Sequence, residues 1–171
     1  FSHEAQASNA EAALIDLQMY CNQTKPFNLI PNRESSAFGV FIEDFSVRIV
    51  RINAHNPEIP TPLPKSIVGL QMLETLSITR GNFLQFPKQL THLKNLKNLY
   101  MAKCSLFSVP SYIKHMNSLE DLWLSFNNFK TIPPEINHLS SLKKIVFLKN
   151  KIERLPQNIS ELKKLKHLDL K

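Results

Sequence analysis

The chain has 171 residues, of which 43% are hydrophobic and 20% charged, and its formal net charge is +7. This composition is typical of a folded globular protein and excludes a disordered or collagen-like chain. The longest apolar stretch, residues 37–42, is far shorter than the roughly 18 residues of a membrane-spanning helix. We therefore expect no membrane span.

Leucine and charge are both distributed unevenly along the chain. Three leucines precede residue 61 and 21 follow it. Residues 1–61 contain four basic and seven acidic side chains, whereas residues 62–171 contain 17 basic and seven acidic ones. A basic part favours acidic partners, although scattered lysines are equally typical of a solvated surface. The two trends predict an N-terminal cap over residues 1–61 and a separate unit over residues 62–171.

The N-terminal part contains two predicted elements. Ser8 to Tyr20 is rich in alanine, leucine and glutamate, and Ser8 or Asn9 can cap its start, so we expect a helix there. Residues 37–53 favour a strand pair or one bent strand. Within them Val50 and Ile52 lie 26 residues before an apolar pair of the following unit. This spacing indicates an atypical first repeat.

From residue 62 onward one pattern recurs every 23 residues. Each copy starts with an apolar residue followed by proline and ends in an LxxLxL segment. The alternating end predicts a short strand, and the three-residue spacing before it predicts a helical or 3-10 segment. The apolar–proline pairs are Leu63-Pro64, Phe86-Pro87, Val109-Pro110, Ile132-Pro133 and Leu155-Pro156. Units of this size bury their apolar edges only by stacking on one another, which gives a parallel sheet.

One polar position follows each predicted strand. Asn127 and Asn150 occupy it in two repeats, Cys104 in a third, and Gly81 in the first. An asparagine there can satisfy buried backbone groups where the chain leaves the strand. With Gly81 in place of asparagine, we expect a locally irregular turn. Cys21 and Cys104 are too few for a disulfide framework or a zinc site, and are either two buried thiols or one bridge.

These repeats resemble the 23-residue class of the leucine-rich repeat family, LPxxIxxLxxLxxLxLxxNxL. The resemblance covers about residues 62–171. It implies a right-handed α/β solenoid, with a curved parallel sheet on the concave face and helical or 3-10 segments on the convex face. It also implies protein recognition on the concave sheet.

The strand alternation predicts which side chains point outward on that sheet. Tyr100, Trp123, Val146 and Leu148 are expected to lie adjacent there, with Phe126 at their margin and Lys144 and Lys149 as steering charges. An exposed aromatic and aliphatic patch is what an interaction hot spot requires. The alternative is that these side chains merely cover one another.

The function predicted from these features is a non-enzymatic protein–protein interaction module. Its partner is a protein, acidic if the lysines steer it. The alternative is a regulatory or targeting fragment of a larger receptor or enzyme that continues beyond residue 171. The sequence contains no recognisable nucleophile motif and no paired carboxylates at a plausible cleft, so we expect no catalysis and no cofactor.

Three other ligand classes were weighed. His92, His115 and His138 recur with the repeat, but no further ligand converges on them, so we expect no metal. Nucleic acid is disfavoured because no nucleic-acid motif is present. Self-association is a further option, because an uncapped C-terminal strand is a pairing liability. Two Asn-x-Ser/Thr tripeptides and the absence of cysteine-rich caps leave the compartment open.

Overall fold

The computed structural model describes residues 3–21, 38–43, 46–55 and 58–171. One α-helix and two strands precede five units that each contain a 3-10 helix followed by a strand. The elements are α1 (His3–Tyr20), β1 (Gly39–Glu43), β2 (Ser46–Asn53), η1 (Lys65–Gly69), β3 (Thr75–Thr79), η2 (Lys88–His92), β4 (Asn98–Ala102), η3 (Ser111–His115), β5 (Asp121–Trp123), η4 (Pro134–His138), β6 (Lys144–Val146), η5 (Ile159–Glu161) and β7 (His167–Asp169). No described helix is long and apolar enough to cross a membrane.

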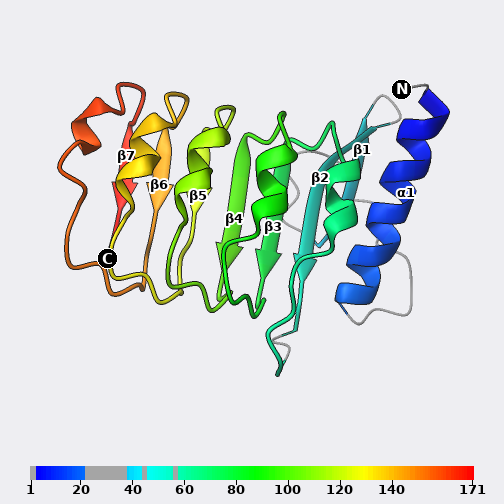
Figure 1. Ribbon diagram of the computed structural model, residues 1–171, viewed down its shortest axis with the longest axis horizontal. Helices are drawn as coiled ribbons and strands as arrows, with labels where there is room; N and C mark the ends of the chain where they lie inside the picture. The colour runs from blue at the N-terminus through cyan, green and yellow to red at the C-terminus, as the bar shows by residue number, and fades with distance from the viewer. Residues whose placement is uncertain (1–2, 22–37, 44–45, 56–57) are drawn as a thin grey trace.

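The strands form one seven-stranded sheet in chain order (Figure 1). β2 to β7 are parallel, and β1 pairs antiparallel with β2. Consecutive parallel strands match residues 23 positions apart, except that β2 and β3 match residues 26 apart, as in Val50 with Leu76. The predicted solenoid is therefore confirmed. The strand pair, rather than one bent strand, is the arrangement that residues 39–53 adopt.

The core lies between the sheet and the 3-10 helices, which Figure 1 shows stacked in a row along one face of it. In each full repeat the inward strand residues and the isoleucine or leucine of the 3-10 helix are fully buried, as for Leu122, Leu124 and Ile136. The proline of each LP pair begins the helical turn: the backbone N–H of Leu90 donates to the Pro87 carbonyl at 3.2 Å. One LP pair thus places one apolar side chain over the sheet in every repeat.

The polar position after each strand connects neighbouring repeats. The Asn127 side-chain oxygen accepts hydrogen bonds from the backbone N–H groups of Cys104 (2.9 Å) and Leu106 (3.1 Å). Its side-chain nitrogen donates to the carbonyls of Met101 (2.8 Å) and Leu124 (3.0 Å). Asn127 therefore serves backbone groups of two repeats at once, and the predicted role of this position is confirmed.

Cysteine and asparagine occupy this position in different ways. Asn150 repeats the Asn127 pattern, with its side-chain nitrogen 2.8 Å from the Leu124 carbonyl. Cys104 lies 3.4 Å from the carbonyls of Ile78 and Ala102. Cys21 and Cys104 are both buried free thiols. Burial raises the pKa of Cys21 to about 11 and that of Cys104 to about 12, so both are protonated at neutral pH.

Helix α1 covers the first repeat at the N-terminal end of the solenoid (Figure 1). It begins at His3, five residues before the predicted start. Its buried residues Ala13 and Leu17 belong to the main core, and the Ser66 hydroxyl donates to the Asp16 carboxylate. At the other end of the helix, the Tyr20 ring stacks on Phe83 with centroids 6.1 Å apart. These contacts agree with a capping role for the N-terminal part.

Gly69 marks the closest approach between α1 and the repeats. A Cβ atom at Gly69 would lie 2.6 Å from the backbone oxygen of Asn9. The same repeat position is His92, His115 and His138 in the next three repeats, where each side chain is exposed. The first repeat therefore carries glycine because the helix occupies the space that a side chain would need.

Replacing Gly69 with alanine should lower the free energy of unfolding by about 1–3 kcal/mol, because the new methyl group clashes with the backbone of α1. Urea denaturation followed by circular dichroism measures this change. His115→Ala alters the same repeat position away from α1 and should change stability by less than about 0.5 kcal/mol. Equal effects of the two substitutions would contradict the role assigned to Gly69.

Asn127→Ala should destabilise the protein by about 3 kcal/mol, because two backbone donors and two carbonyls lose their buried partner. Asn128→Ala, at the exposed neighbouring position, is the matched control and should be nearly silent. The same urea titration applies. A small loss for Asn127→Ala would mean that water replaces the amide group.

Candidate functional site

The outward-facing side chains of β2 to β7 form columns that run across the sheet. The parallel register places Tyr100 beside Trp123 and Trp123 beside Val146. Arg51 and Ser77 precede them in the same column and Asp169 follows. The structure therefore brings together the side chains that alternation placed on the concave face.

Tyr100 and Trp123 form an edge-to-face aromatic pair at the centre of this column. Their ring centroids lie 5.4 Å apart with an interplanar angle of 62°. The Lys144 ammonium lies 4.6 Å from the Trp123 ring centroid, a cation–π geometry. Both rings are only partly exposed. We call Tyr100, Trp123 and Lys144 the aromatic cluster.

The exposure predicted for Val146 is wrong. Its side chain is 2% exposed, although it occupies an outward position. The outward face is crowded enough for large side chains to cover a small neighbour, and Val146 is the smallest apolar residue of the predicted patch. Leu148 is partly exposed, and Phe126 is 49% exposed. The accessible apolar surface of this patch therefore comes from the rings and Leu148.

A second line of side chains borders the concave face where each strand ends. Arg80, Lys103, Phe126 and Lys149 occupy the same position in successive repeats and all have a left-handed backbone, with φ of 55°, 55°, 57° and 55°. Non-glycine residues rarely adopt this conformation. Each backbone N–H still bonds to the following repeat, as Phe126 does to Leu148 at 2.8 Å. We call these four residues the left-handed row.

The left-handed row is cationic and contains one aromatic ring. The Lys103 ammonium lies 5.4 Å from the Phe126 ring centroid. Within the described ranges, no ion pair involves its three basic side chains. By contrast, Lys143 pairs with Glu120 at 2.6 Å, and Lys97 lies 3.8 Å from Glu74. The cations available to a partner thus lie at the margin of the aromatic cluster.

Burial shifts the pKa values of charged groups beside the aromatic cluster. The pKa of Asp121 is raised mainly by desolvation, and Lys144 opposes that shift. The pKa of Tyr100 is also raised by desolvation and further by Asp121. Desolvation lowers the pKa of Arg51. These shifts indicate that water is partly excluded from the centre of the concave face.

Two buried polar atoms of the concave face lack a hydrogen-bond partner. They are Nε1 of Trp123 and the hydroxyl oxygen of Ser125. Trp123 can only donate through this atom, whereas Ser125 can donate or accept. Buried polar atoms of native proteins are nearly always paired, so each unpaired one requires a reason. A ligand that carries hydrogen-bond acceptors would supply one.

The structure places the remaining candidate residues away from this face. His92, His115 and His138 are exposed at the ends of η2, η3 and η4. No group of three or more metal-ligating side chains occurs in the described part of the chain. Sequence reasoning did not anticipate the left-handed backbone. The 23-residue recurrence of two consecutive outward residues after each strand is the signal that accompanies it.

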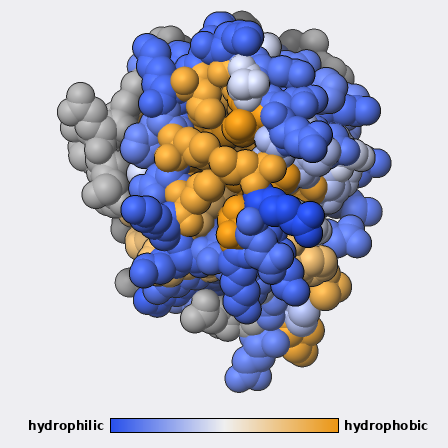
Figure 2. Space-filling view, turned by 90° about the vertical axis from the view of Figure 1, so that its left-hand side faces the viewer, coloured by the Kyte–Doolittle hydropathy of each residue, from blue (hydrophilic) through white to orange (hydrophobic). Residues whose placement is uncertain are grey.

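The C-terminal end of the solenoid is a separate apolar surface. β7 is the last strand of the sheet and pairs only with β6 among the described strands. Figure 2 looks onto this end and shows apolar residues gathered at its centre within a hydrophilic surround. Leu155 and Leu168 are exposed in this last unit. Residues 149–171 contain seven basic and three acidic residues, which makes this end positively charged.

Comparison with known proteins identifies the repeats. The sequence model described as Leucine Rich Repeat matches residues 118–139. A leucine-rich-repeat protein of Leptospira interrogans is 32% identical with a TM-score of 0.65, over 72% of this chain and 31% of that one. The chain is a leucine-rich-repeat protein. No curated protein sequence matches it.

Two further solved structures share the solenoid. The leucine-rich-repeat ectodomain of the receptor kinase SOBIR1 from Arabidopsis thaliana has a TM-score of 0.70 at 17% identity, over 95% of this chain and 92% of that one. A plant ice-binding protein has a TM-score of 0.64 at 22% identity, over 86% and 49%. At these identities the likeness shows the fold alone. This leucine-rich-repeat chain spans about a third of the Leptospira protein and half of the ice-binding protein.

The raised pKa of Asp121 predicts a pH-dependent effect on stability. Because the folded state binds this proton more tightly than the unfolded state, ionised Asp121 costs stability at neutral pH. Asp121→Asn should therefore raise the melting temperature at pH 7, and the gain should disappear near pH 3, where both states are protonated.

Lys144→Met supplies the control for this interpretation. Lys144 lowers the pKa of Asp121, so its removal should raise that pKa further, as measured by NMR titration of the carboxyl group. A fall in the Asp121 pKa after Lys144→Met would contradict the described placement of the ammonium.

Proposed function

We propose that this leucine-rich-repeat chain is a non-enzymatic module that binds a protein partner on its concave face. The aromatic cluster carries this proposal, because Tyr100 and Trp123 lie partly exposed on the open face of the sheet rather than in the core. Large aromatic side chains dominate the binding energy of protein interfaces. Leucine-rich-repeat proteins generally act as binding modules, which supports the same function.

The charges around the aromatic cluster favour an acidic partner. Lys144 lies over Trp123, and Lys103 and Lys149 belong to the left-handed row. A partner carboxylate near Trp123 would meet the Lys144 ammonium and also accept a hydrogen bond from Nε1, which lacks a partner. Such a contact satisfies a buried donor and a cation together. The other lysines would raise the association rate by steering.

Side-chain geometry favours protein over nucleic acid as the partner. Binding of single strands relies on open aromatic faces on which bases stack. Here the Lys144 ammonium lies over the Trp123 ring, and Tyr100 and Trp123 are engaged with each other. A base would have to displace those contacts. A protein side chain needs only to add to the margin of the aromatic cluster.

Two further predictions keep their standing as hypotheses. One is that the chain forms the regulatory or targeting part of a larger receptor or enzyme. The other is self-association through the C-terminal end shown in Figure 2. The excess of basic residues in residues 149–171 opposes contact between two identical ends. An acidic partner on the concave face is the function that the side chains support best.

Trp123→Ala tests the proposed function. The variant should fold cooperatively, since Trp123 is outside the core cluster, and should weaken partner binding by about 1–2 kcal/mol or more. Quantitative affinity capture with both proteins identifies partners that depend on Trp123. Isothermal titration with the purified partner then gives the loss of affinity and its dependence on salt.

His115→Ala, on the convex side of the solenoid, is the matched control and should bind like the wild type. If Trp123→Ala unfolds, the ring belongs to the core and the proposed face is wrong. If the same partners bind wild type and Trp123→Ala equally, the concave face is not the binding surface. Affinity that does not fall as salt rises would exclude the acidic partner.

A further inference from the structure

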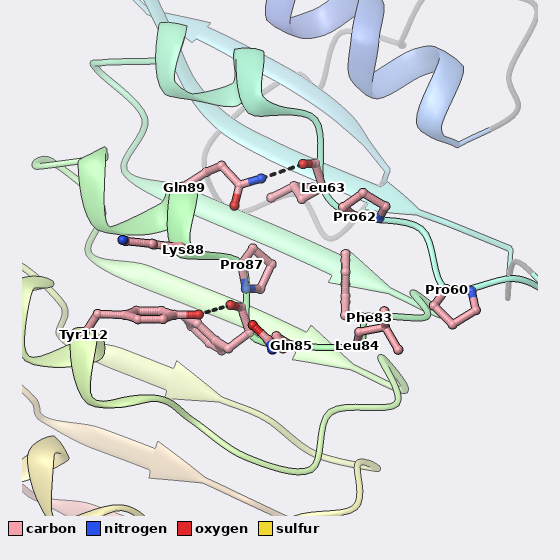
Figure 3. Close-up of a pocket in the computed structure, with 11 residues that line it drawn as sticks. Pro60, Pro62, Leu63, Phe83, Leu84, Gln85, Pro87, Lys88, Gln89 and Tyr112 are labelled. Carbon is pink, nitrogen blue, oxygen red and sulfur yellow. Dashed lines mark hydrogen bonds between the residues drawn. The ribbon is translucent and has the colours of Figure 1, made fainter.

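The connections that follow β2 and β3 enclose a pocket away from the concave face. Its volume is about 380 Å³, within the range of ligand-binding clefts. Figure 3 shows its lining side chains, which come from the segment before η1, the β3–η2 connection, η2 and η3. Pro60, Pro62, Leu63, Phe83, Leu84, Gln85, Phe86, Pro87, Lys88, Gln89 and Tyr112 line it. None of them belongs to the aromatic cluster or the left-handed row.

The pocket lies where the repeat is irregular. The register between β2 and β3 is 26 residues instead of 23, so the connection after β2 has three additional residues. This connection supplies Pro60 and Pro62, and the backbone N–H of Thr61 attaches it to the Asn82 carbonyl at 2.9 Å. The longer connection stands beside the next one instead of repeating its path. The space between them is the pocket.

The walls of the pocket are already in place before a ligand arrives. Leu63 and Phe86 are fully buried at its base. The Gln89 side-chain nitrogen donates to the Leu63 carbonyl at 2.7 Å, and the Tyr112 hydroxyl donates to the Phe86 carbonyl (Figure 3). Prolines and hydrogen-bonded side chains lose little conformational freedom on binding. The pocket is therefore suited to take up an apolar group at low entropic cost.

Exposed apolar side chains extend the pocket along the same edge of the solenoid. Leu84 is 68% exposed and forms part of the lining. Phe107 occupies the same position in the next repeat and is 58% exposed. Apolar side chains that gather beside an open pocket are typical of protein interaction sites. The surface around this pocket is thus larger than one small molecule would need.

Charge indicates what kind of segment would bind there. Lys88 is the one charged residue of the lining, and it forms no ion pair in the described part of the chain. Residues 62–171 as a whole contain 17 basic and seven acidic residues. An acidic ligand would complement both the local and the overall charge.

We propose that this pocket binds an acidic segment of a partner protein that inserts one aromatic or branched apolar side chain between Pro62, Leu84 and Tyr112. The apolar side chain fills the pocket, and a neighbouring carboxylate reaches Lys88 at its rim. This second site is independent of the concave face, so it stands or falls separately from the proposed function.

The test uses the full isotope-labelled chain and a short peptide with a central phenylalanine flanked by glutamates. Saturable NMR shift changes should appear at the backbone amides of Leu84, Gln85 and Tyr112, and should be absent at Trp123. Peptides with a central alanine, or with lysines in place of the glutamates, should bind much more weakly. Shift changes confined to other surfaces, or none, would overturn the proposal.

Two pairs of variants locate the interaction. Leu84→Ser should weaken peptide binding about tenfold and Lys88→Gln about threefold. Phe107→Ser and Lys65→Gln change the same repeat positions outside the lining and should leave the affinity unchanged. All four side chains are exposed, so the fold should persist, as thermal denaturation would verify.

Equal losses within each pair would show general surface attraction and refute a defined pocket. Trp123→Ala should bind the peptide like the wild type. A loss with Trp123→Ala and none with Leu84→Ser would assign the acidic segment to the concave face instead, and would overturn the second site without affecting the proposed function.

Discussion

Buried hydrogen bonds at one repeat position hold the solenoid together where its strand ladder ends. β5 to β7 are only three residues long, so the backbone beyond each strand needs other partners. Asn127 bonds to backbone groups before and after its own strand, and Asn150 repeats this in the next unit. Without these side chains, buried donors and carbonyls would be unpaired in every turn. Stacking of the repeats, and hence the shape of the concave face, depends on this position.

The same backbone step shapes the candidate binding surface. To bring Asn127 inward, the preceding Phe126 adopts a left-handed conformation and points outward directly after Ser125. Two consecutive outward residues then follow each strand, which widens the concave face by one row. In this chain that row is cationic and borders the aromatic cluster. Structural support inside and binding capacity outside therefore come from one turn of the backbone.

Irregularity at the N-terminal end has two consequences. Helix α1 covers the first repeat, and its close approach requires Gly69 where later repeats carry exposed histidines. The longer connection between β2 and β3 leaves the pocket lined by prolines and aromatic rings. A strictly regular array would have neither feature. The cap ends the array, and the adjustment beside it creates a surface that the regular repeats do not offer.

The sequence by itself determined the repeat, the faces of its strands and the role of Asn127, because inward leucines and a buried polar side chain must recur with the backbone period. It also placed Trp123 beside Tyr100, since parallel strands in register align equal positions. Tertiary structure alone decided that Val146 is covered, that Lys144 lies over Trp123, and that the β2–β3 irregularity encloses a pocket. Those outcomes depend on side-chain packing between repeats and on contacts with a non-repetitive segment, which no period in the sequence records.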